Sequence, residues 1–396
     1  MKKSERDEYD KTYGLYKFKR PLPSEIESAM GLVGESILFK KLISADYERF
    51  YDPIKIQEEG DWLMTHKEFG QTYNEYIQND CYQVDPNHNV IYIHRFSSND
   101  DLIKDELFQN VIILLEAFFT GMKVYLYDEG TNYLNNNNEN DNENENNNNE
   151  NNNNNENNNN ENNNNNENNG ENNIENNNNM ENNVDNNNII KNAQNEKMAI
   201  NADQLLEKLK LEMPEDAYCV FGIIDNDLYT ESLSYNGKRL IKSTYCKRSI
   251  QDRVAIFSLA RFDPFFNFNG KINNLSKEQK YKISLILLKR ICNAITREIC
   301  YMFGMKNCIF LSCCMNGTNV TEFDNKQIEL CPICLRKLVT NIKANGEDIK
   351  TYRVKKPLIV FNRFVKMRDA LDNFAGIYEN EIKWFDARID FLKGLI

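Results

Sequence analysis

The stretch REICYMFGMKNC, residues 297–308, ends a long helical pattern and leads into a cluster of cysteines. Ser276 and Gln279 form a capping box that predicts where the helix begins, and Gly304 predicts where it ends. Between them, apolar residues recur with a 4-3-4-3 spacing, at Tyr281, Leu285, Leu288, Cys292, Ile295, Ile299 and Met302. This spacing predicts one long helix with a continuous buried stripe.

Arg297 and Tyr301 lie four residues apart on that helix, roughly opposite the stripe at about 100° per residue. We therefore expect their side chains to face outward. Such a face either lines a cleft or is merely solvated, because Lys289, Arg290 and Asn293 lie near it.

Four cysteines downstream carry the strongest chemical signal. Cys331 and Cys334 form a C-x-x-C before a helix-like run, whose first N–H groups would help to hold thiolates. Cys308 and Cys313 supply a second pair, so that four soft ligands fit a structural tetrahedral zinc site. Unligated buried thiols and a redox dithiol are the alternatives. Cys314 is the alternative to Cys313 as a ligand.

The surrounding pattern is α/β. It predicts strands over residues 90–95, 122–127, 218–224 and 254–259, and helices over 101–120, 199–212, about 355–374 and 377–394. Ser24 and Glu27 predict a helix start by a capping box, and Gly121 a helix end. Residues 35–85 show no clear period.

Residues 135–188 are nearly all Asn, with 12 acidic residues and no Lys or Arg. The tract has almost no apolar side chains, so burial of apolar surface cannot compensate for the entropy lost on ordering, and we expect a disordered insert. The alternative is that the Asn tracts self-associate as β-structure. The rest of the chain has 48 acidic and 48 basic residues and is formally neutral. Neither a basic nucleic-acid surface nor a polybasic membrane face is expected.

No apolar run approaches the roughly 18 residues of a membrane span, and the sequence MKKSERDEYDKTYG lacks the apolar core of a signal peptide. Ten cysteines without an export signal favour a reducing compartment. We expect a cytoplasmic monomer, and a nuclear location is compatible with the same observations.

Together these motifs resemble the archaemetzincins, a metzincin-like family of zinc peptidases. The family pattern is H-E-x-x-H-x-x-G-x-x-H-C, then C-x-M, then C-x-x-C. Glu298 and Gly304 keep their places in it, and Met315 matches the methionine of the Met-turn. The segments DNDLY (225–229), VAIFSLARF (254–262) and LCPICLRKL (330–338) are also similar to the family.

The resemblance spans roughly residues 88–396 without the insert. It implies a metzincin-like α/β (α+β) fold: a twisted mixed sheet, a long active-site-type helix, a C-terminal part stapled by a four-cysteine zinc, and terminal helices. It places the domain at 88–134 plus 198–396, with residues 1–87 as a partly helical extension and 135–197 as the insert.

The three positions that hold histidine in the family carry Arg297, Tyr301 and Asn307. A guanidinium has no lone pair to offer, a phenol binds zinc only as a phenolate from a pKa near 10, and an amide oxygen is a weak donor. The histidines, at 66, 88 and 94, all precede the insert. One structural zinc is therefore expected, and a second, catalytic one is not.

Glu298 keeps the position of the general base, but without zinc-bound water it has little to act on. We expect it to pair with a cation such as Arg297. Cys300, one turn from Arg297, is a candidate replacement ligand, or a nucleophile if His94 approaches it in space.

Three functions follow as hypotheses. The first is a pseudo-metallopeptidase whose old cleft binds a peptide or protein. The second is an active zinc peptidase with a rebuilt site and Glu298 as general base. The third is a zinc-stapled interaction module.

Overall fold

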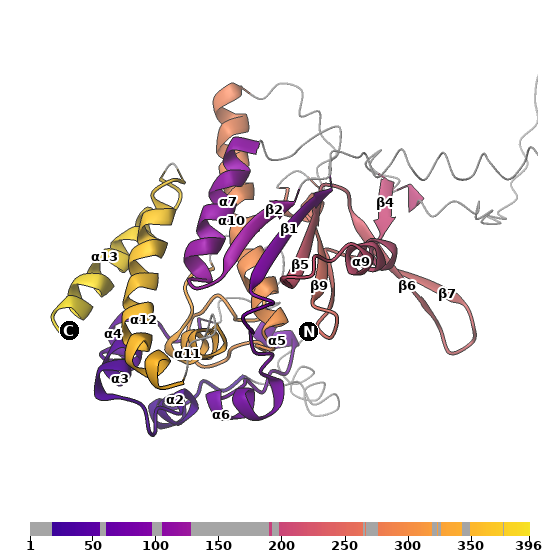
Figure 1. Cartoon of the computed structure of the whole chain (residues 1–396). Coiled ribbons are helices and arrows are strands. Elements are labelled where there is room, and N and C mark those ends of the chain that lie inside the picture. Colours follow the sequence, from indigo (N-terminus) through magenta and orange to yellow (C-terminus); the bar gives the residue numbers. More distant parts are fainter. Residues whose placement is uncertain are drawn as a thin grey trace, which may run out of the picture. The chain divides into compact units, whose positions relative to one another are not determined.

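A computed structural model describes residues 18–55, 61–96, 105–127, 190–191, 198–263, 266, 276–318, 323, 326–342, 349–374 and 376–396 (Figure 1). The Asn-rich tract at 135–188, with its predicted disorder, lies outside these residues. So do residues 101–104 of the helix predicted over 101–120.

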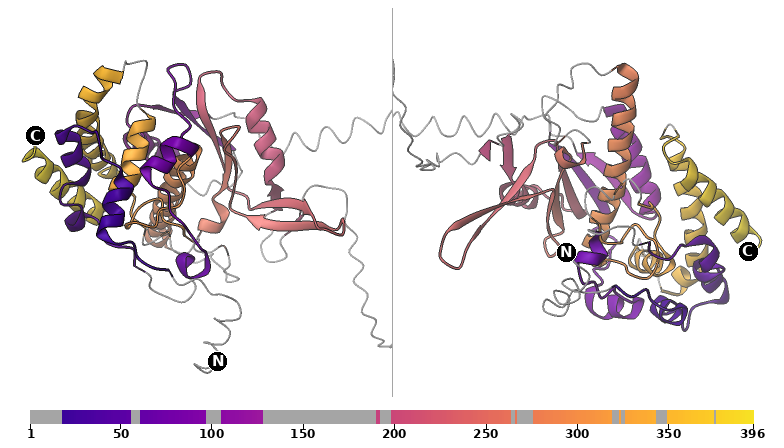
Figure 2. Two further views of the ribbon diagram at one scale, coloured as in Figure 1. Left: turned by 90° about the horizontal axis from the view of Figure 1, so that it is seen from below. Right: turned by 180° about the vertical axis from the view of Figure 1, so that it is seen from behind.

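A five-stranded mixed sheet lies at the centre of the fold, in the order β2-β1-β5-β9-β8 (Figures 1 and 2). Its strands are β1 (Val90–Phe96), β2 (Lys123–Tyr127), β5 (Ala217–Ile224), β8 (Cys246–Ser249) and β9 (Val254–Ser258). The first four in sheet order are parallel, and β8 is an antiparallel edge. Every residue of β5 and β9 is buried, as expected for strands covered on both faces. The four predicted strands and the mixed sheet are confirmed.

Helices cover both faces of this sheet. The helices α7 (Asp105–Phe118) and α10 (Lys277–Met302) lie on one face, and α9 (Ala202–Leu211) lies on the other (Figures 1 and 2). Gly222 of β5 permits the close approach of α9, because a Cβ there would lie 2.8 Å from the side chain of Leu209. The helix predicted over 199–212 is partly wrong, since its first residues belong to a strand.

That strand belongs to a second sheet, in the order β3-β4-β6-β7. Its members are β3 (Ile190–Lys191), β4 (Met198–Asn201), β6 (Leu228–Leu233) and β7 (Arg239–Thr244). The strands β6 and β7 form an antiparallel hairpin, which sequence analysis missed.

The long helix α10 begins and ends as predicted. The Ser276 side chain accepts from the N–H of Gln279, whose own side chain accepts from the N–H of Ser276. Gly304 follows the helix with φ of 82°. The stripe is buried from Leu285 onward, but Tyr281 is 48% exposed, because the first turns of α10 lie outside the core.

The N-terminal segment contains the short helices α2 (Pro23–Met30), α3 (Ile37–Ser44), α4 (Tyr47–Phe50), α5 (Trp62–Thr65) and α6 (Tyr73–Glu75), then the π turn η1 (Tyr76–Asp80). The N-cap of helix α2 is Leu22, two residues before the predicted Ser24. Its capping carboxylate is Glu25, which accepts from the N–H of Leu22, and not Glu27. Elements this short cannot display a clear period, which explains why residues 35–85 showed none.

The C-terminal helices are α11 (Pro332–Asn341), α12 (Ile349–Leu371) and α13 (Glu379–Lys393). The N-terminal segment packs against them: Met30, Phe39 and Leu42 belong to the same buried cluster as the main sheet and α10. Glu35 adds polar contacts, at 2.9 Å to Arg336 of α11 and 2.9 Å to Lys356 of α12. No helix in the described ranges has the length and apolar character to cross a membrane.

Candidate metal centre and the face of the long helix

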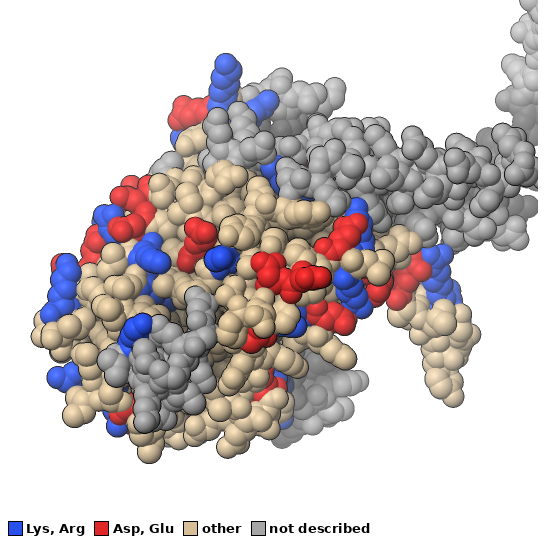
Figure 3. Space-filling view, in the orientation of Figure 1, with Lys and Arg blue, Asp and Glu red and all other residues tan. Residues whose placement is uncertain are grey.

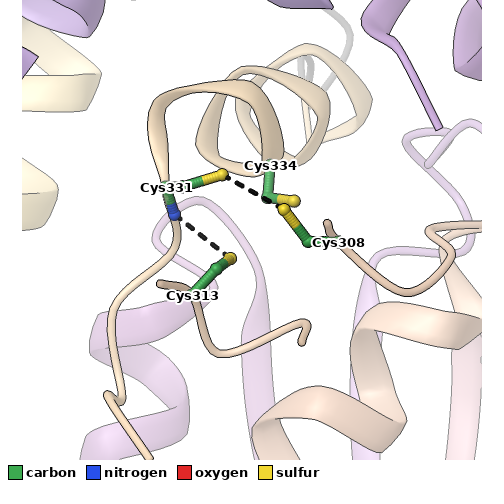
Figure 4. Close-up of side chains that lie close together, drawn as sticks. All are labelled: Cys308, Cys313, Cys331 and Cys334. Atoms are coloured by element: carbon green, nitrogen blue, oxygen red, sulfur yellow. Dashed lines mark hydrogen bonds between the residues drawn. The ribbon is translucent and has the colours of Figure 1, made fainter. Parts of the chain in front are cut away.

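The structure brings the side chains of Cys308, Cys313, Cys331 and Cys334 together (Figure 4). All four sulfur atoms are buried and lie within 4.8 Å of one another. Two cysteines come from the loop after α10, one caps α11, and one lies in its first turn. Four thiols converging from separate positions form a cage for an ion, whereas a redox dithiol would need only two of them.

Backbone and amide hydrogen bonds fix the loop that carries the first pair. The N–H of Cys308 donates to the carbonyl of Met315 at 2.8 Å. The amide of Asn316 donates to the carbonyl of Cys308 at 2.9 Å and accepts from the N–H of Cys313 at 2.8 Å. The Cys313 sulfur accepts from the N–H groups of Cys331, at 3.2 Å, and Met315, at 3.4 Å. One donor is thus the N-cap residue of helix α11 and the other lies in the loop after α10, whereas the sequence predicted the first N–H groups of the helix itself.

The donor set fits zinc. A Zn–S distance of about 2.3 Å in a tetrahedron places the sulfur atoms roughly 3.8 Å apart, and Cys308 and Cys331 are already 3.6 Å apart. Hydrogen bonds from Cys313, Cys331 and Cys334 lower the pKa of the Cys308 thiol well below its usual value. Burial and the neighbouring thiols raise the pKa of the other three well above the usual value, so a cation is needed to stabilise all four as thiolates.

Cys314 does not join the four. Its sulfur lies 3.5 Å from the hydroxyl of Thr296 and 4.0 Å from the carbonyl of Asn293, beside α10. Burial raises its pKa, which keeps the thiol neutral.

The predicted exposure of Arg297 and Tyr301 is wrong. Arg297 is 4% exposed, Tyr301 7% and Glu298 1%. Asn293 is buried too, so the alternative of a merely solvated face is also wrong. Strand β8 and the segment around residues 62–71 supply the side chains that contact this face.

The side chains at the three positions that the resemblance assigns to metal ligands bond to one another. Arg297 Nε donates to the Tyr301 hydroxyl at 2.9 Å, and its Nη2 lies 3.4 Å from Asn307 Oδ1. The Tyr301 hydroxyl also donates to Asn307 Oδ1. Burial raises the pKa of Tyr301 above its usual value, so the phenol stays protonated. The Asn307 amide donates outward to Glu68 at 2.6 Å.

Glu298 does pair with a cation, but the cation is Arg248 of β8 and not Arg297. Its Oε2 accepts from Arg248 Nη1, and the Cys246 thiol lies 3.4 Å from the same oxygen. The guanidinium of Arg248 also lies 4.0 Å from the centroid of the Tyr301 ring. The Glu298 carboxylate is thus bonded to side chains of β8. A general base would instead need access to water.

Cys300 has no feature of an activated nucleophile. It is buried, and burial raises its pKa well above the usual value. Nucleophilic cysteines need the opposite shift. The imidazole of His94 on β1 lies beside the rings of Phe96 and Tyr127.

A cleft of about 380 Å³ adjoins this network. Its walls include Tyr301 and Asn307 of the degenerate motif, and Glu68, Arg248 and Lys306. Sequence analysis missed Glu68 and Arg248, since each is far from the helix in sequence. Only the Asn236-Gly237 pair could have indicated the hairpin that leads into β8.

A catalytic zinc does not fit the residues present. At the three positions there is a buried cation without lone pairs, a protonated phenol and an amide oxygen that accepts two hydrogen bonds. The described part of the chain has only one cluster of at least three potential metal ligands, the four cysteines.

Comparison with known proteins finds relatives that match most of the chain. It is 28% identical to archaemetzincin-2 of Pongo abelii over 306 residues, which cover 73% of this chain and 69% of that protein. It is 27% identical to archaemetzincin-2 of Homo sapiens, again over 73% of this chain and 69% of that protein. The chain is similar to the archaemetzincins over about three quarters of its length. No family model matches it.

The chain is also 28% identical to archaemetzincin-1 of Homo sapiens, over 162 residues that cover 36% of this chain. Among solved structures, the archaemetzincin of Methanopyrus kandleri is 15% identical, with a TM-score of 0.35, over 65% of this chain and 97% of that chain. The chain combines similarity to the archaemetzincins with a cysteine cluster that could hold a metal.

Proposed function

We propose that this archaemetzincin does not hydrolyse peptides, holds one structural zinc at its four cysteines, and uses the former catalytic cleft for binding. One observation carries the proposal. The guanidinium of Arg297 is hydrogen-bonded to Tyr301 and lies within reach of Asn307, so the side chains at the three ligand positions contact each other.

A zinc ion at this place would have to break that network and lie beside a buried positive charge. Two like charges a few ångströms apart repel by several kcal/mol at the low effective dielectric of such a site. Zinc also needs three donors with free lone pairs, and Arg297 offers none. Glu298 then has no metal-activated water from which to take a proton.

The cleft is suited to bind an extended peptide or protein segment. Its wall combines the aromatic ring of Tyr301 with the amide of Asn307 and the charged groups of Glu68, Arg248 and Lys306. Such a mixture of aromatic and convergent polar groups is typical of binding clefts. Substrate positioning does not require the metal, so binding can persist after catalysis is lost.

The first test is the zinc content of the purified protein with its peptidase activity. We expect one zinc per chain in the wild type and clearly less in Cys331→Ser, because three thiolates hold the ion more weakly than four. Arg297→Ala should leave the ratio at one. Hydrolysis of a mixed peptide library should stay at background.

Two zinc ions per chain in the wild type, or chelator-sensitive cleavage abolished by Glu298→Gln, would establish the active peptidase instead. A matched gain-of-site variant sharpens the test. Arg297→His/Tyr301→His/Asn307→His restores the family ligands, and a rise from one zinc to two would locate the lost site at these positions.

A further inference from the structure

The β6–β7 hairpin carries large apolar side chains in solvent. Leu233 is 76% exposed, Tyr235 is fully exposed, and Leu240 and Ile241 are about half exposed, at 47% and 49%. The hairpin projects away from the five-stranded sheet in all three ribbon views (Figures 1 and 2). In Figure 3 its end is mostly tan, with Lys or Arg side chains beside the tan surface. Clustered apolar side chains on a projecting element mark an interaction surface.

The hairpin is held in one conformation before any partner arrives. The N–H of Ser234 donates to the carbonyl of Lys238 at 2.8 Å, and the N–H of Gly237 to the carbonyl of Ser234 at 2.9 Å. Gly237 has φ of 74°, which suits glycine. Glu231 and Arg239 form an ion pair across the two strands, and β4 pairs with β6 on the other side. A preformed element loses little entropy on binding.

One edge of the hairpin is free. Strand β7 ends the order β3-β4-β6-β7, so among the described residues it pairs only with β6. Its outer N–H and C=O groups can therefore bond to an added strand. Natural edge strands are usually blunted by charge, but here Leu240 stands between the charged positions on one face of β7, and Ile241 is apolar on the opposite face.

The charges on this edge select the partner. Lys238, Leu240 and Lys242 alternate along the chain and so point to the same side of the ribbon. Neither lysine has a carboxylate within 4.0 Å among the described residues, whereas Arg239 is paired with Glu231. An antiparallel copy of β7 centred on Leu240 would set Lys238 opposite Lys242, and like charges in direct opposition destabilise a sheet.

We propose that β7 binds an extended acidic segment of a partner protein, which adds to the sheet as a further strand. The matching segment has acidic residues opposite Lys238 and Lys242 and an apolar residue opposite Leu240. This inference is independent of the cleft and of zinc. A duplex nucleic acid is a poorer fit, because the apolar centre between the lysines has no counterpart in a phosphate backbone.

Fluorescence anisotropy with a labelled peptide STEVLVETS tests this, since its two glutamates flank a leucine with the required spacing. We expect binding to the full chain. Lys238→Glu/Lys242→Glu should weaken it roughly tenfold or more, because two attractive cross-strand pairs become repulsive. The charge-reversed peptide STKVLVKTS should bind the variant better than the wild type.

Two controls separate strand addition from simple charge attraction. Lys366→Glu/Lys383→Glu makes the same change of net charge at two exposed lysines on α12 and α13, and it should leave binding unchanged. The peptide STEPLPETS keeps the charges but lacks two strand N–H groups, and it should not bind.

The proposal is overturned if STEVLVETS does not bind, or if both double variants lose the same amount of affinity for it. It is also overturned if STEPLPETS binds as tightly as STEVLVETS. Tighter binding of a 20-base-pair DNA duplex than of the peptide overturns it too. Dimerisation of the wild type that Lys238→Glu/Lys242→Glu abolishes would mean that a second copy of the chain occupies the edge. The zinc content of the β7 variants should equal that of the wild type. The result of the peptide-binding experiment therefore does not depend on the result of the zinc measurement.

Discussion

At the scale of single residues, this protein concentrates buried charge on one face of α10. Arg297 and Glu298 are buried next to each other on α10, and Arg248 reaches them from β8. A buried charge without a partner is costly, so these groups stabilise the fold only as a set. The four cysteines are a second buried polar set, and they become favourable when a cation neutralises them.

A double-mutant cycle measures the Arg248–Glu298 pair. Arg248→Met should cost about 3 kcal/mol, because it leaves the Glu298 carboxylate buried without its cation. Glu298→Gln should cost less, about 1–2 kcal/mol, since the Arg248 side chain is 35% exposed and can turn to solvent. The double variant should cost about 1–2 kcal/mol less than the sum, by urea unfolding. Strict additivity would show that the two side chains do not interact.

At the scale of elements, the turn that follows α10 requires glycine at position 304. Gly304 ends α10 in the left-handed region, and a Cβ there would overlap the carbonyl oxygen of Asp80 in η1. The adjoining carbonyl of Phe303 accepts from the Tyr76 hydroxyl at 2.9 Å. The turn after the helix thus packs against the N-terminal segment, whatever chemistry the helix once performed.

Gly304→Ala should therefore destabilise the protein by about 3 kcal/mol or more, as left-handed strain adds to displacement of the Asp80 backbone. Gly394→Ala is the matched control. It lies at φ of −72° with its nearest contact at 3.4 Å, and it should change stability by less than about 0.5 kcal/mol. Equal thermal midpoints for the two variants would contradict the steric argument.

At the scale of the whole molecule, the Asn-rich tract lies in the sequence between β2 and β3. We propose that it is a passive insertion. Loop-closure entropy grows only slowly with length, so the fold tolerates a long connection.

Deletion of residues 135–188 should leave the zinc ratio unchanged. Shortening the connection roughly eightfold should raise the free energy of unfolding by at most about 2 kcal/mol. Urea unfolding with metal analysis of the two proteins checks both expectations. A less stable or zinc-poor deletion variant would assign the tract a structural role.

The local pattern of the sequence determined the elements whose signals are local. The capping box at Ser276, the period of the α10 stripe and the apolar runs of β1, β5 and β9 were sufficient to predict these elements. Spacing alone also selected Cys308, Cys331 and Cys334, because metal ligands recur at short, fixed intervals. It left Cys313 and Cys314 as alternatives, and the structure places Cys313 with the other three.

Only the tertiary structure decided the environment of the former active-site face. Helical phase placed Arg297 and Tyr301 opposite the apolar stripe, and this predicted exposure. Strand β8 and the segment carrying Glu68 cover that face instead, through contacts between residues 50 and 239 positions apart. Periodicity describes which side chains share a face of one helix, but long-range packing determines what that face contacts. The sequence therefore determined which residue types stand at positions 297, 301 and 307, and the fold decided that their side chains form a buried polar network.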